Sequence, residues 1–154
     1  MPGEIPGGDL SDARPVSPAP LHLLKMAVGI ADIDDLRRVR AARTKQHGGS
    51  WVYTRNQPRR AAAVLAGGSI YWVIRGQIQV RQGVTGFRGE RDANGRRYCL
   101  IEVDAELVPT LSRAWRPFQG WRYLSAGDAP ADRSGDGEPS PDRLLAELRS
   151  LGLI

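Results

Sequence analysis

The chain has 154 residues, 41% of them hydrophobic, and a formal net charge of +5. This length fits one domain, and no apolar run approaches the roughly 20 residues that cross a bilayer. A single cysteine, Cys99, excludes an internal disulfide and a cysteine-based metal cluster. We therefore expect a cytoplasmic protein that has no membrane partner, and residues 1–20 lack the pattern of a secretory signal.

Positive charge is concentrated in the middle of the chain. Residues 21–124 contain 18 Lys and Arg side chains against 8 Asp and Glu, whereas residues 1–20 and 125–154 are both net acidic. Of these 18 cations, 16 are arginine, whose planar guanidinium suits phosphate and carboxylate ligands and stacks on bases. A genome that favours arginine codons would produce the same bias, so charge alone does not decide a function.

The first elements in chain order are a leader, a strand and a basic helix. Residues 1–20 are rich in Pro, Gly, Ser and Asp, which predicts a disordered leader. The apolar run of residues 21–28 predicts a buried strand. Asp32 is a typical N-cap for a helix that ends near Gln46, before a Gly-Gly pair. The acidic start and basic end of this helix suit its dipole, which explains its arginines without a ligand.

A second strand and a short helix follow. The segment WVYTR, residues 51–55, has the composition of a strand. Residues 59–66 predict a helix, because Pro58 suits its first turn and another Gly-Gly pair suits its end.

Residues 69–82 alternate with period two, which is typical of a strand. A continuous strand would place Ile70, Trp72, Ile74, Gly76, Ile78 and Val80 on a core face, and Arg75, Gln77, Gln79 and Arg81 on the other. Such a long strand favours a bent sheet or small barrel with a kink at Gly76. A tight turn at Arg75-Gly76 is the alternative interpretation.

A hairpin is expected next, because Asn94-Gly95 lies between the strand patterns of residues 84–91 and 96–103. Cys99 shares the core-facing side of the second strand with Arg97, Ile101 and Val103, and we expect it to be an inert structural thiol. Residues 104–111 fit either a turn or a short strand interrupted by proline.

The C-terminal part combines an aromatic segment, a linker and a helix. Residues 116–124 (RPFQGWRYL) are dense in aromatic and cationic side chains. Residues 125–139 have a linker composition, and residues 140–154 carry leucines at the spacing of a short amphipathic helix. We therefore predict an α+β fold in which residues 21–124 form one domain. This domain would be a small bent or barrel-like mixed sheet with two flanking helices.

No motif in the sequence predicts catalysis. His22, His47 and Cys99 lack metal-ligand spacing, and the chain has no nucleophile elbow, phosphate-binding loop or dinucleotide fingerprint. Asp104 and Glu106 are two residues apart, which fits a solvated turn better than paired-carboxylate chemistry. We predict no catalytic residue, no metal site and no cofactor, and these residues favour a protein without enzymatic activity while leaving an enzyme as an alternative.

A binding surface is the functional prediction. Arginines supply phosphate contacts, glutamines reach base edges and aromatic rings stack on bases. The candidate ligand-binding residues are therefore Arg75, Gln77, Gln79, Arg81, Arg116, Gln119, Trp121 and Arg122. They predict a binding protein for nucleic acid, or for a nucleotide-like anion such as a phosphorylated small molecule, and they place binding on the strand face and not on the basic helix.

Two other functions fit the same residues. A pocket lined by Arg75, Gln77, Trp121 and Arg122 would suit a small-molecule enzyme. Alternatively, the basic face would suit a protein-interaction module.

The sequence also resembles a known family. The segments LHLLKMAVG (21–29), PRRA (58–61), GGSIYWVIRGQIQVRQ (67–82), PFQGWRYL (117–124) and residues 128–130 resemble a bacterial family catalogued as domain of unknown function 1489. This resemblance covers residues 21–132, so the leader and the C-terminal helix would lie outside it, and it implies no activity. The order of elements is similar to that of PUA-like barrels of the ASCH and EVE type, which implies a barrel that binds RNA or modified bases.

Overall fold

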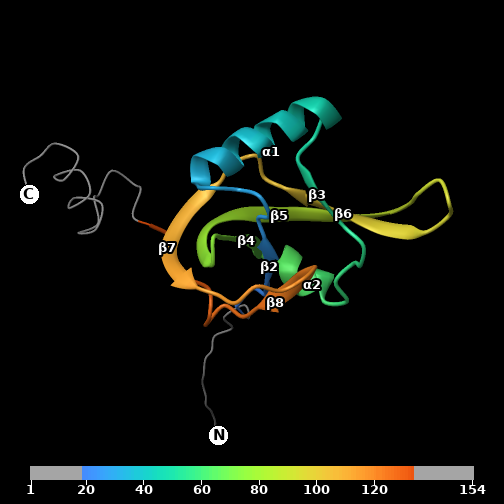
Figure 1. Cartoon of the computed structure of the whole chain (residues 1–154). Helices are drawn as coiled ribbons and strands as arrows, with labels where there is room; N and C mark the ends of the chain where they lie inside the picture. The colour runs from blue at the N-terminus through green and yellow to red at the C-terminus, as the bar shows by residue number, and fades with distance from the viewer. Residues whose placement is uncertain (1–18, 134–154) are drawn as a thin grey trace, which may run out of the picture.

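The computed structural model describes residues 19–133, which contain two helices and seven strands (Figure 1). The predicted C-terminal helix and residues 1–18 of the predicted leader lie outside this range. No described helix is long and apolar enough to cross a membrane. The elements are β2 (His22–Met26), α1 (Ile33–His47), β3 (Trp51–Thr54), α2 (Ala61–Leu65), β4 (Ser69–Ile74), β5 (Gln77–Arg91), β6 (Arg97–Val103), β7 (Val108–Ala114) and β8 (Trp121–Leu124).

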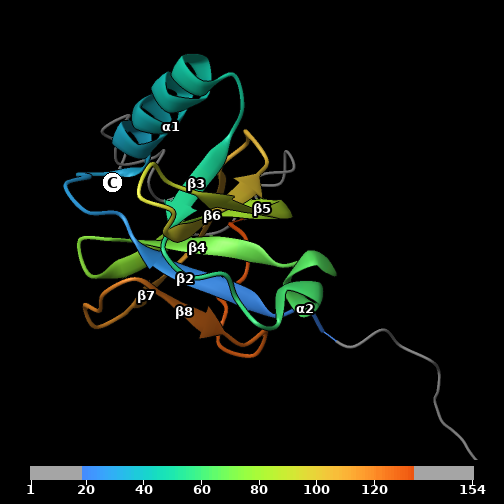
Figure 2. The ribbon, with the colours of Figure 1, turned by 90° about the vertical axis from the view of Figure 1, so that its right-hand side faces the viewer.

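The strands form one mixed sheet in the order β3-β6-β5-β4-β2-β8, with β7 also paired to β5. Only β2 and β4 are parallel among these pairs. The first part of β5 pairs with β4 and β7, and its second part pairs with β6. The strand therefore belongs to two half-sheets, and it bends between them (Figure 1). In Figure 2 the two half-sheets lie one above the other. The predicted α+β fold with a bent mixed sheet is confirmed, and the sheet of the described residues is not closed into a barrel.

The main core lies between these two half-sheets. Buried side chains from β4, such as Trp72, contact buried side chains from β3 and β6, such as Val52 and Ile101. Leu36 from α1 and Val64 from α2 complete this core. Cys99 is also part of it, as predicted, and burial raises the pKa of its thiol.

A second, smaller core lies on the opposite face of β4. It contains Tyr71 and Val73 from β4, together with Leu24, Ile78 and Leu124. All six residues of β4 are consequently buried. The sequence analysis placed only one face of this segment in a core, and the structure covers both.

The long predicted strand is in fact a hairpin with a bulge. Arg75 and Gly76 have positive φ values of 50° and 79°, so they form the tight turn that was the alternative interpretation. Trp72 then pairs with Val80 while Val73 pairs with Ile78, which leaves Gln79 as the extra residue. The continuous alternation was therefore wrong, because the turn and the bulge each change which face a residue occupies.

The second hairpin agrees with the prediction. The amide of Gly95, which has a positive φ of 78°, donates to the carbonyl of Asp92, and the amide of Asp92 donates to the carbonyl of Arg96. The side chain of Asp92 also accepts from the amides of Asn94 and Arg96. This hairpin projects from the body of the domain (Figure 1).

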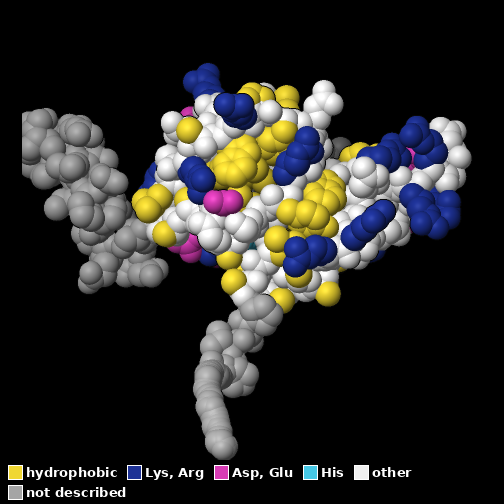
Figure 3. Space-filling view, turned by 90° about the horizontal axis from the view of Figure 1, so that it is seen from below, with side chains coloured by type: hydrophobic (Ala, Val, Ile, Leu, Met, Phe, Trp, Pro, Cys, Tyr) yellow, Lys and Arg dark blue, Asp and Glu magenta, His cyan; other side chains and the backbone are white. Residues whose placement is uncertain are grey.

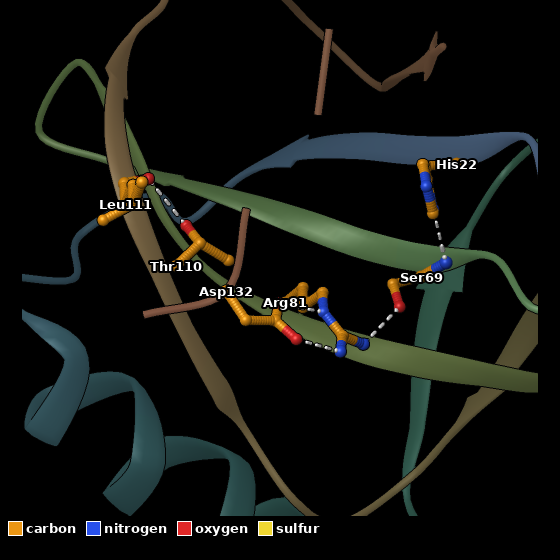
Figure 4. A network of polar contacts seen from close by, with 6 residues as sticks. All are labelled: His22, Ser69, Arg81, Thr110, Leu111 and Asp132. Atoms are coloured by element: carbon orange, nitrogen blue, oxygen red, sulfur yellow. Dashed lines mark hydrogen bonds and ion pairs between the residues drawn. The ribbon is translucent and has the colours of Figure 1, made fainter. Parts of the chain in front are cut away.

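The ordered chain continues past residue 124, where the sequence analysis placed the end of the domain. The amide of Leu111 donates to the carbonyl of Ala131, and that of Arg133 donates to the carbonyl of Pro109. Arg81 holds both carboxylate oxygens of Asp132 at 2.7 Å (Figure 4). Residues 125–133 therefore lie against β7, and only 134–139 of the predicted linker fall outside the described residues.

The ion pair between Arg81 and Asp132 should make stability depend on pH. Its hydrogen bonds hold the pKa of Asp132 below the usual range. The pair therefore stabilises the fold at neutral pH, and this contribution is lost as the pH falls through the lowered pKa. Asp132→Asn should reduce the free energy of unfolding by up to about 1 kcal/mol at pH 7 and by almost nothing near pH 2, as urea titrations would measure.

Asp128→Asn is the matched control, because the ion pair of Asp128 with Arg113 is longer, at 3.6 Å. An Asp132→Asn protein as stable as the wild type at pH 7 would show that this pair does not hold the segment.

Candidate functional site

The strand residues of the predicted site do not share one face. Arg75 lies in the tight turn, and Gln77 pairs with Ile74 at the start of β5. Gln79 is the bulge residue, and its side-chain amide donates to the carbonyl of Ile74 at 3.1 Å. Arg81 pairs with Tyr71, which belongs to the second core. The row of four side chains predicted for a ligand is therefore broken up.

The guanidinium of Arg81 forms hydrogen bonds with other residues of the protein. Besides Asp132, its guanidinium donates to the hydroxyl of Ser69 at 3.0 Å (Figure 4). The hydrogen bond with Asp132 raises the pKa of Arg81. Burial, and then the charge of Arg81, lower the pKa of His22, whose Nδ1 accepts from the amide of Ser69. This network connects β2, β4 and β5 to the segment after β8.

The other four predicted residues lie in β8 or in the loop that precedes it. Arg116 and Gln119 are exposed in the preceding loop. The guanidinium of Arg122 lies 5.3 Å from the ring centre of Phe118 and donates to the carbonyls of Gln119 and Trp121. Trp121 packs against the main core, and its Nε1 donates to the carbonyl of Asn56. The eight predicted residues thus lie in several places, and none of them lines either of the two grooves described below.

The structure places a different aromatic surface on the outer face of the β3–β6–β5 half-sheet. Tyr53 is 50% exposed there, and its ring centre lies 5.3 Å from that of Tyr98. Trp51 lies two residues before Tyr53 on the same strand face. Leu100 pairs with both Tyr53 and Arg88.

Cations surround these rings. The guanidinium of Arg88 lies 5.1 Å from the ring centre of Trp51, and that of Arg55 lies 5.8 Å from the ring centre of Tyr53. The rings, Arg88 and side chains from α1 form a shallow groove of about 590 Å³, which we call the aromatic groove. It is lined by Arg43, His47, Trp51, Tyr53, Arg88, Glu90, Asp92, Tyr98 and Leu100.

A second groove, which we call the arginine groove, adjoins the first. It has a volume of about 980 Å³ and is lined by Arg55, Asn56, Gln57, Arg59, Gly89, Glu90, Arg91, Arg97 and Tyr98. Glu90 and Tyr98 line both grooves. Figure 3 shows Lys and Arg side chains gathered along the projecting hairpin at the right of the view.

Sequence reasoning missed both grooves, although part of the signal was present. Alternation in WVYTR places Trp51, Tyr53 and Arg55 toward one face. The Asn-Gly turn fixes the hairpin register, which pairs Glu90 with Tyr98. What the sequence does not show is that β3 pairs with β6.

The described residues offer no group of three or more His, Cys, Asp or Glu side chains that could hold a metal ion. Most of the residues that line the two grooves are arginine, aromatic or amide residues, which bind anions and stack on flat rings.

A family model described as a protein of unknown function (DUF1489) matches residues 23–154. The chain belongs to this family. The match confirms the resemblance, but it also includes residues 133–154, so the DUF1489 region extends further toward the C-terminus than the sequence analysis placed it. Neither the curated proteins nor the solved structures gave a match, and the similarity to PUA-like barrels stays a hypothesis.

Proposed function

We propose that this protein binds single-stranded nucleic acid, with bases stacked in the aromatic groove and phosphates on the arginines around it. The observation that carries the proposal is the pair of Tyr53 and Tyr98, whose rings lie 5.3 Å apart beside a groove on the outside of the sheet. Tyr53 is exposed to solvent. An exposed ring of this kind has free area for a base.

The arrangement of charge supports the same ligand. Arg43 from α1 and Arg88 from β5 line the aromatic groove. Arg55, which directly follows β3, lies against the ring of Tyr53. Phosphates next to each stacked base would then meet guanidinium groups. A duplex fits this groove poorly, because its bases are already stacked and paired, whereas a single strand offers free base faces.

Oligonucleotide binding measured by fluorescence anisotropy tests the proposal. A single strand of about 12 nucleotides should bind at about 50 mM salt and weaken steeply as salt is raised. Tyr53→Ala and Tyr98→Ala should each weaken binding by roughly 10-fold or more, because a base–aromatic stack contributes about 1–3 kcal/mol. Duplex DNA of the same sequence should bind less tightly than the single strand.

Tyr53→Phe and Tyr98→Phe are the matched controls, since they keep the ring and should keep the affinity. The sequence-predicted surface is tested alongside by Arg75→Gln and Arg116→Gln, which we expect to leave binding nearly unchanged. The proposal fails if the wild type binds no oligonucleotide, or if the arginine variants lower the affinity and the alanine variants do not.

A further inference from the structure

The arginine groove contains a charge conflict. Arg91 of β5 lies directly opposite Arg97 of β6 in the ladder. Like charges in directly opposed positions destabilise a sheet. Neither side chain forms an ion pair with a carboxylate of residues 19–133, and the same holds for Arg59. An anion held between them would relieve this repulsion.

Glu90, which lines the groove, and Asp92 beside it both have partners other than Arg59, Arg91 and Arg97. Glu90 pairs with Arg88 at 3.2 Å, on the side of the aromatic groove. Asp92 uses one oxygen to accept from backbone amides of the hairpin turn, and its other oxygen lies 3.8 Å from Arg55. The four arginines of the groove therefore outnumber the carboxylate charge available to them.

The walls of the groove are held in place without a ligand. Arg55 donates to the carbonyl of Arg97, and Arg91 donates to the carbonyl of Gly95, both at 2.9 Å. The indole of Trp121 donates to the carbonyl of Asn56, which fixes the loop after β3. Each guanidinium keeps further N–H groups for a ligand, since it carries five.

The floor of the groove is open at Gly89. A Cβ atom at this position would have only the side-chain oxygen of Gln57 nearby, at 3.7 Å. No side chain at position 89 therefore fills the groove.

We infer that the arginine groove binds a terminal phosphate group of the nucleic acid strand, and this inference rests on the proposed function. An internal phosphodiester carries one negative charge, whereas a terminal phosphomonoester carries about −1.5 to −2 at pH 7 and has more acceptor oxygens. The four arginines of the groove suit the greater negative charge of a terminal phosphate. Arg91 and Arg97 are the ladder pair next to Glu90 and Tyr98, so their side chains point to the other face of the hairpin. Tyr98 lines both grooves, so a strand whose last base stacks on Tyr98 and whose end passes over the edge of the hairpin brings its terminal phosphate to Arg91 and Arg97.

The test compares strands of about 12 nucleotides that share one sequence and an internal label but differ at their ends. The ends are a hydroxyl at both termini, a 5′-phosphate, a 5′-triphosphate or a 3′-phosphate. One terminal phosphate should raise the affinity of the wild type at least about tenfold, as expected for charge-assisted bonds to arginine. Arg91→Gln with Arg97→Gln should abolish this preference and leave binding of the unphosphorylated strand within about threefold.

Arg75→Gln with Arg116→Gln carries the same charge change at a distant place and should retain the preference. Equal affinity for all four strands would overturn the inference while leaving the proposed function intact, and no binding of any strand would overturn both. Inorganic tripolyphosphate distinguishes the source of the phosphate. If it binds as tightly as the phosphorylated strand, the groove is a site for free polyphosphate and the inference is wrong.

Discussion

Reversing the charge of Arg43 and Arg88 together is expected to weaken single-strand binding by about 100-fold or more at about 50 mM salt. Both side chains line the aromatic groove, one from α1 and one from β5. Arg43→Glu and Arg88→Glu would place carboxylates where the phosphates of the stacked strand must lie. The salt dependence of the remaining binding should also become shallower, because fewer counterions are released.

The matched control is Arg37→Glu with Arg38→Glu on the same helix. This variant makes the same change in net charge, but its two arginines pair with Asp34 and Asp35 and do not line either groove. We expect it to lower the affinity by less than about fivefold, through the long-range field alone. Equal losses in the two variants would mean that binding follows overall charge and that the aromatic groove has no special role.

Replacing Gln82 by leucine is expected to destabilise the fold by about 3 kcal/mol. Gln82 is completely buried on β5. Its side-chain oxygen accepts from the indole nitrogen of Trp72 at 3.0 Å, and its amide donates to the carbonyl of Asp104 at 2.9 Å. Leucine can form a hydrogen bond with neither the indole N–H of Trp72 nor the carbonyl of Asp104. A buried donor or acceptor without a partner costs about 1–3 kcal/mol.

Chemical denaturation measures this loss, and Gln77→Leu is the control. Gln77 is an exposed glutamine at the start of the same strand, so its replacement should change the free energy of unfolding by less than about 0.5 kcal/mol. If Gln82→Leu is as stable as the wild type, the amide is not needed to connect Trp72 with the segment between β6 and β7.

Local patterns in the sequence were sufficient for most elements. The N-cap of α1 is Asp32, whose side chain accepts from a free backbone amide of the first turn, and its C-cap is Gly48, which adopts a positive φ of 75°. Both effects are local, so they do not depend on where the helix packs. The Asn-Gly hairpin formed for the same local reason. The bent sheet was predicted from one continuous strand over residues 69–82, whereas this segment is a hairpin and the bend lies further along, where β5 passes from pairing with β4 to pairing with β6.

The site could not be predicted in the same way, because it depends on contacts between distant parts of the chain. The sequence pattern of Arg81 predicted an exposed side chain. In the structure it pairs with Asp132, which lies in a segment whose composition predicted a linker. The bulge at Gln79 depends on how β4 and β7 pair with β5. The aromatic groove needs β3 beside β6, and Tyr53 and Tyr98 are 45 positions apart in the sequence.

The position of β2 in the sheet has a consequence for synthesis on the ribosome. This strand is made first among those described, yet its neighbours are β4, which begins at Ser69, and β8, which ends at Leu124. The nascent chain therefore exposes an apolar strand until both partners have left the exit tunnel. Pairings between such distant segments also form slowly. The last strand to emerge completes the sheet, so a chain interrupted before residue 121 would leave β2 open to pairing with other chains.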